Sequence, residues 1–80
     1  MTPQDWRLRV QRPGLSIWQH RVSGTRVHAI QMHAWWHLIA TDPKADRRLS
    51  LGFERSSRAA ERGARSFMAA NEHGGEAVDA

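Results

Sequence analysis

The sequence predicts an α+β fold in which an antiparallel sheet of three to five strands packs against one C-terminal α-helix. Up to Glu54, segments with alternating apolar and polar residues are separated by turn dipeptides, which is typical of antiparallel strands. From Ser56 onward the apolar period changes to that of a helix. A chain of 80 residues makes one domain of this kind. We place it at residues 1–73 and expect the acidic segment 74–80 to be a disordered tail.

The first strand is predicted in "DWRLRVQR". Trp6, Leu8 and Val10 alternate there with polar residues, so all three are expected on one face, with Arg7 and Arg9 on the other. Pro13-Gly14 then turns the chain.

The next two segments, "LSIWQHRV" and "TRVHAIQM", are rich in β-branched and aromatic residues. Ser23-Gly24 lies between them and favours a tight turn. We therefore expect a hairpin, in which Arg21 and Arg26 lie nearly opposite one another across the turn.

The segment "HAWWHLIATD" fits two periods. As a continuation of a helix from Val27 it would end at Asp42-Pro43, whereas as a strand it places alternate side chains on opposite faces. The adjacent tryptophans, Ile39 and Thr41 favour the strand. The polar "DPKAD" and the alternating "RRLSLGFE" then complete a second hairpin with a loop of four to five residues.

The C-terminal helix is predicted in "SSRAAERGARSFMAAN", with Ser56 or Ser57 as N-cap and Gly74-Gly75 as a stop. Small residues dominate its apolar side, so the helix can approach the sheet closely. The residues on that side are Ala60, Ala64, Phe67 and Asn71, flanked by Gly63 and Met68. Large side chains are expected to fill the space between helix and sheet, namely Trp6, Trp36 and Phe53.

Arginines recur on the opposite side of the same segment, at Arg55, Arg58, Arg62 and Arg65. Glu54 and Glu61 are spaced to pair with this stripe and to neutralise part of it. Because these arginines point away from the sheet, the positive charge is expected on two faces of the molecule. The stripe is either a solvated helix face or a set of partner contacts, and the sequence leaves both open.

Composition excludes several classes of protein. The chain has no cysteine, hence no disulfide, and no stretch reaches the roughly 18 apolar residues of a membrane span. It also lacks an apolar leader at its N-terminus. We expect a cytoplasmic protein without membrane contact. Residues 1–71 hold all twelve basic residues and five acidic ones, a formal charge of +7.

No constellation predicts catalysis or metal binding. His33 and His37 have i, i+4 spacing, but on a strand four residues span about 13 Å, too far for one ion. The serines lack a nucleophile-elbow setting, and most carboxylates stand beside arginines that would keep them ionised. We therefore expect no enzyme, no cofactor and no metal.

Binding is the remaining function. The candidate contact residues are Arg7, Arg9, Trp35, His37, Arg55, Arg58, Arg62 and Arg65. They suit a nucleic-acid binder in which arginines hold phosphates and Trp35 or Trp18 stacks on bases. They also suit an inhibitor or adaptor that binds a protein or ribonucleoprotein, and we prefer this hypothesis, with direct nucleic-acid binding as the alternative. A third hypothesis is a homodimer in which the second copy covers Trp35.

The chain resembles the small phage- or prophage-encoded proteins among which anti-CRISPR inhibitors are found. The resemblance lies in its small size, its lack of cysteine, the "WRLRV" and "IWQHRV" strands and the terminal "SSRAAERGARSFMAAN" helix. These share no common motif, so the resemblance assigns no residue. It implies inhibition by binding to a host Cascade or Cas-type complex, which blocks DNA binding. Since many such proteins are acidic DNA mimics, the basic body of this chain implies contacts to acidic or aromatic protein surface or to guide RNA instead.

Overall fold

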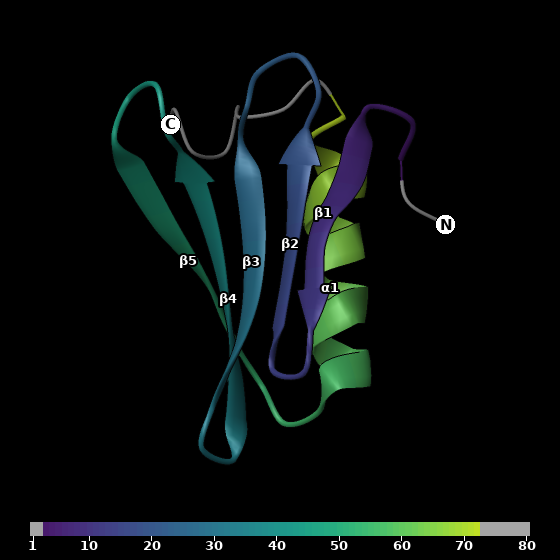
Figure 1. Ribbon diagram of the computed structural model, residues 1–80, viewed down its shortest axis with the longest axis vertical. Coiled ribbons are helices and arrows are strands. Elements are labelled where there is room, and N and C mark those ends of the chain that lie inside the picture. The colour runs from purple at the N-terminus through teal and green to yellow at the C-terminus, as the bar shows by residue number, and fades with distance from the viewer. Residues whose placement is uncertain (1–2, 73–80) are drawn as a thin grey trace.

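Five consecutive strands and a final helix follow one another in the computed structural model, which describes residues 3–72 (Figure 1). Each strand pairs antiparallel with the next, so the sheet order is β1-β2-β3-β4-β5. The elements are β1 (Trp6–Arg12), β2 (Leu15–His20), β3 (Arg26–Met32), β4 (Trp35–Asp42), β5 (Arg47–Glu54) and α1 (Ser57–Ala70). The predicted fold class is confirmed, and the ambiguous tryptophan segment is a strand. Gly74-Gly75 and the predicted tail lie outside the described residues.

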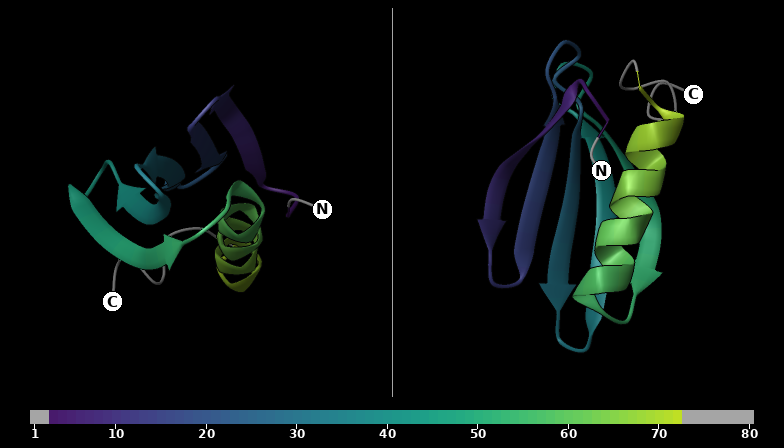
Figure 2. Two further views of the ribbon diagram at one scale, coloured as in Figure 1. Left: turned by 90° about the horizontal axis from the view of Figure 1, so that it is seen from below. Right: turned by 90° about the vertical axis from the view of Figure 1, so that its right-hand side faces the viewer.

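The sheet curls around the helix, which lies on its inner side (Figure 2). The core between them consists of Trp6, Trp18, Val27, Ala29, Leu38, Ala60, Ala64 and Met68. A β-carbon added at Gly63 would come 2.7 Å from the Cδ1 atom of Leu38, so the small residues of α1 do allow a close approach. Ser56 is the N-cap, and its hydroxyl accepts the backbone N–H of Ala59. In the described part of the chain, no helix is long and apolar enough to cross a membrane.

Two β-bulges overturn part of the predicted alternation. In β1 the register shifts between Leu8 and Val10, and the extra residue turns Val10 away from the helix, although it was predicted to share a face with Trp6. In β5 the shift lies opposite Leu38 and Ile39, where Gly52 has a φ of 117°. Phe53 therefore points outward and is 57% exposed, which corrects its predicted place in the core.

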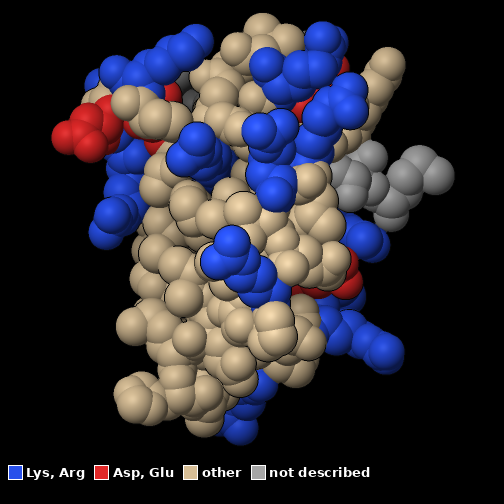
Figure 3. Space-filling view, viewed as in Figure 1, with Lys and Arg blue, Asp and Glu red and all other residues tan. Residues whose placement is uncertain are grey.

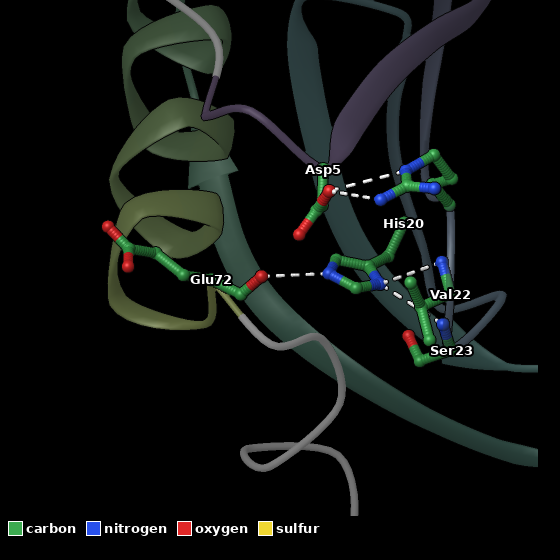
Figure 4. Close-up of polar contacts among 6 residues, drawn as sticks. Asp5, His20, Val22, Ser23 and Glu72 are labelled. Atoms are coloured by element: carbon green, nitrogen blue, oxygen red, sulfur yellow. Dashed lines mark hydrogen bonds and ion pairs between the residues drawn. The ribbon is translucent and has the colours of Figure 1, made fainter.

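His20 joins the turn between β2 and β3 to the residues that follow the helix (Figure 4). Its ring is buried, and its Nδ1 atom accepts the backbone N–H groups of Val22 (3.2 Å) and Ser23 (3.1 Å). Nε2 therefore carries the proton and donates it to the carbonyl oxygen of Glu72 at 2.7 Å. Beside it, Arg21 forms an ion pair with Asp5 at 3.0 Å. The predicted position of Arg21 opposite Arg26 is wrong, because Gln19 is the residue that faces Arg26.

Replacing His20 by alanine is expected to lower the free energy of unfolding by about 3 kcal/mol, because a buried ring is removed and three part-buried backbone groups lose their partner. Urea denaturation followed by far-UV circular dichroism measures the change. Val22→Ala is the matched control in the same turn, since Val22 is 66% exposed, and it should alter stability by less than about 0.5 kcal/mol. Equal stability of the two variants would contradict this role of His20.

Candidate nucleic-acid interface

The convex face of the sheet, turned away from α1, is called the open face here. Cross-strand partners share a face of a sheet, so the register assigns its members. Its described strand positions are Arg7, Arg9, Val10, Arg12, Leu15, Ile17, Gln19, Arg26, His28, Ile30, Met32, Trp35, His37, Ile39, Thr41, Arg48, Ser50 and Phe53. None of these residues is acidic, so the arginines among them have no carboxylate neighbour on the face itself.

One line of residues crosses all five strands and is called the basic row. It consists of Arg7, Gln19, Arg26, Thr41 and Arg48, each paired with the next in the register. Because neighbouring strands lie about 4.8 Å apart, an arginine recurs about every 10 Å, with a hydrogen-bonding neutral side chain between. This spacing suits an extended polyanion that lies across the strands.

Aromatic side chains occupy the other end of the open face. The aromatic cluster consists of Trp35, His37, Phe53 and Arg55. The rings of His37 and Phe53 are stacked at 4.2 Å with 10° between their planes, and the Arg55 guanidinium lies 5.0 Å from the centre of the Trp35 ring. Trp35 is 43% exposed and Phe53 57%. His37 thus covers one face of the Phe53 ring and Arg55 one face of the Trp35 ring, while both side chains remain partly exposed, as stacking on unpaired bases requires.

The two ends differ in charge as well. Figure 3 looks onto the open face, because the helix lies behind the sheet in this view. Lys and Arg gather toward the upper end, where the turns at 21–25 and 43–46 lie, whereas uncharged atoms cover most of the lower half. The open face is therefore basic at one end of the strands and aromatic at the other.

His28 lies next to the basic row on β3. Its Nε2 atom is 3.2 Å from the Thr41 hydroxyl, and the ring is half-buried. Burial lowers the pKa of His28 from 6.5, and the Arg26 and Arg48 guanidinium groups lower it further. Both guanidinium groups therefore lie close enough to the His28 ring to influence its protonation.

The predicted contact residues divide between two surfaces. Arg7, Arg9, Trp35 and His37 lie on the open face, as does Arg55, which precedes the N-cap and contacts Trp35 instead of belonging to the helix. The remaining three arginines, Arg58, Arg62 and Arg65, belong to α1. The predicted stripe of four is therefore corrected to three.

The carboxylates near the stripe behave differently from one another. Glu61 pairs with Arg65 at 3.3 Å, as predicted, but Glu54 ends β5 and cannot form a pair within the helix. The helix stripe is therefore partly neutralised. By contrast, the arginines of the open face have no carboxylate among its described strand positions. The positive charge is therefore concentrated more on the open face than on the helix, whereas the sequence predicted that both would carry it.

Trp18 is buried and belongs to the core, so its predicted role in base stacking is wrong. Conversely, sequence reasoning missed Arg26, Arg48, His28 and Phe53 as site residues. Strand alternation could have placed Arg26 and Arg48 on one face, given the correct turn residues. Phe53 could not have been found in this way, because the bulge in β5 reverses its direction.

His33 and His37 lie in different settings. His37 contacts the Ser50 hydroxyl at 2.9 Å, and His33 stands in the turn after β3 with a φ of 58°. Within residues 3–72, no three His, Asp or Glu side chains gather closely enough to hold a metal ion.

The geometry defines a small α+β protein with a sheet face whose described strand positions include no acidic residue and which is basic at one end and aromatic at the other. Comparisons of the chain with family models, with curated proteins and with solved structures find no match. No family membership is therefore shown.

Proposed function

We propose that this chain is a non-enzymatic binding protein whose open face binds single-stranded nucleic acid. The observation that carries the proposal is the basic row, whose five residues include no carboxylate, together with the exposed aromatic rings at the opposite end of the same face. Phosphates contact the arginines of the row, while bases stack on Trp35 and Phe53. Paired bases cannot reach these rings, so single strands are favoured over duplexes.

Salt dependence tests this proposal. Three to four phosphate contacts predict that a fluorescein-labelled dT12 oligonucleotide binds about 20- to 50-fold more weakly at 200 mM than at 50 mM salt, measured by fluorescence anisotropy. A duplex of the same length should bind more weakly than dT12 in the same buffer. An affinity for dT12 that does not change between 50 and 200 mM salt would show that the arginines do not contact phosphates.

The aromatic cluster has a test of its own. Trp35→Ala is expected to weaken dT12 binding about tenfold while leaving the salt slope unchanged, because stacking on a base does not involve counterion release. Leu49→Ala is the control, since Leu49 is also exposed, at 37%, but pairs with Ala40 on the helix side of the sheet. Equal affinity of wild type and Trp35→Ala would show that bases do not stack there.

A second proposal is a phage-type, anti-CRISPR-like inhibitor that binds a host CRISPR-Cas or other nucleic-acid-targeting complex and blocks its DNA binding. It is favoured by the apolar exposure at the aromatic end, where Met32 is 51% and Phe53 57% exposed, since such side chains fit a protein pocket. The basic row would then contact guide RNA or an acidic protein surface. A pull-down from host lysate, with and without nuclease, separates a protein partner from nucleic acid. The homodimer stays a prediction that a molecular mass in dilute solution decides.

A further inference from the structure

We propose that Arg26, His28, Thr41 and Arg48 form a binding site for one phosphate group, and that His28 takes up a proton when the phosphate binds. This inference rests on the proposed function, since a phosphate of the bound strand is the occupant. It adds a defined anion subsite and a dependence of binding on pH.

The register brings the four side chains together. Arg26 pairs with Thr41, and Thr41 pairs with Arg48, so the three residues stand side by side on β3, β4 and β5. The imidazole of His28 reaches diagonally to the Thr41 hydroxyl at 3.2 Å. A shallow depression of about 290 Å³ is lined here by His28, Ile30, Ile39, Thr41 and Arg48. The Arg48 guanidinium, the Thr41 hydroxyl and the His28 imidazole therefore line a space that a tetrahedral oxyanion fits, and Arg26, which lines the neighbouring depression, stands beside it as the cross-strand partner of Thr41.

Among the residues that the structure describes, the charged groups near His28 are all positive. On β2 it faces Ile17, on β4 Ile39 and Thr41, and the charged groups near it are Arg26 of β3 and Arg48 of β5. From the β1 side, Arg9 lines a neighbouring depression together with Arg26. The helix packs on the opposite face of the sheet and adds no charge here. These arginines create a positive potential that no described carboxylate near His28 balances, so the site favours binding of an anion.

The direction in which anion affinity changes with pH follows from the pKa of His28 in the empty site and in the occupied site. Without an anion, burial and the two arginines hold the pKa of His28 below 6.5, so the ring is neutral at neutral pH. A bound phosphate raises that pKa, because it stabilises the imidazolium. Affinity therefore rises as the pH falls through the range between the two values, and it is constant above and below that range. Thr41 can accept a hydrogen bond from the protonated ring.

Sulfate is a suitable first probe, since its charge does not change between pH 5 and 8. NMR titration of the His28 ring protons should show that sulfate raises the pKa of His28, and that the Arg26→Gln/Arg48→Gln double variant abolishes the effect. A His28 titration that is indifferent to sulfate overturns the anion site. A rise of equal size in the double variant overturns it too, because the arginines would then play no part.

The second probe is dT12 without a terminal phosphate. Its affinity for the wild type should increase about tenfold from pH 7.5 to pH 5.5, whereas His28→Gln should bind with an affinity that varies much less over this range. Binding with the same pH slope in both proteins overturns the proton uptake and leaves the proposed function intact. If sulfate acts on His28 but dT12 does not bind at any pH, the proposed function fails while the anion site stands.

Discussion

Replacing Trp6 by alanine is expected to lower the free energy of unfolding by about 4 kcal/mol, which is a large part of the total stability of a domain of this size. Trp6 is buried in the core and contacts His20 and Phe67 edge to face, with ring centres 5.1 and 6.3 Å away. Its indole N–H donates to the carbonyl oxygen of Asn71 at 3.1 Å. One side chain thus joins β1 to β2 and to the end of the helix, and its removal loses packing and a hydrogen bond together.

Two tryptophan variants serve as controls in the same urea titration. Trp6→Phe keeps a ring in the core but removes the hydrogen bond from the indole N–H to the Asn71 carbonyl, so about 1–2 kcal/mol should be lost. Trp35→Ala removes a ring that is 43% exposed and should cost less than about 1 kcal/mol. The structural role of Trp6 is contradicted if Trp6→Ala and Trp35→Ala unfold at the same urea concentration.

Reversing the charge of both Arg26 and Arg48 should weaken binding of dT12 by about 100-fold or more at 50 mM salt, because two attractive phosphate contacts become repulsive. Neutralising the same pair with glutamine should reduce the salt slope by about 1.4, the amount expected for two phosphates on a single strand. Both side chains are exposed, so the fold should persist, and far-UV circular dichroism checks this.

The matched control reverses Arg58 and Arg62 on α1, which are also exposed and change the net charge by the same amount. This variant should lose less than about threefold in affinity, because long-range attraction alone is altered. A loss as large as that of Arg26→Glu/Arg48→Glu would show that net charge governs binding. A larger loss would move the interface to the helix, where three of the predicted contact residues lie.

Several elements could be read from the sequence because their signals are local. Pro13-Gly14 does turn the chain between β1 and β2, and Gly14 has the positive φ of 83° that glycine tolerates. The helix begins after a serine N-cap, and its buried side includes Ala60, Ala64 and Met68 at helical spacing. These features depend on a few consecutive residues, so no knowledge of distant neighbours was needed.

The candidate site was only half predictable. Arg7, Arg9, Trp35 and His37 were placed correctly from alternation, and the basic row depends on how five strands align side by side. Arg55 was assigned to the helix because its spacing to Arg58 is helical, but the N-cap at Ser56 leaves it outside the helix, where it meets Trp35. A spacing of three residues does not tell where a helix starts.

By itself, the sequence determined an antiparallel sheet of three to five strands followed by a helix, three of the turns and the small-residue side of the helix, since each follows from local periodicity and turn chemistry. The turn at residues 33–34 was not predicted, because the segment around it also fits a helix. Tertiary structure decided which side chains form the open face. A bulge exists only between two paired strands, and the bulges in β1 and β5 turn Val10 and Phe53 outward. Strand pairing likewise aligned Arg7, Arg26 and Arg48, which are far apart in the chain, because register is a property of neighbouring strands rather than of any one segment.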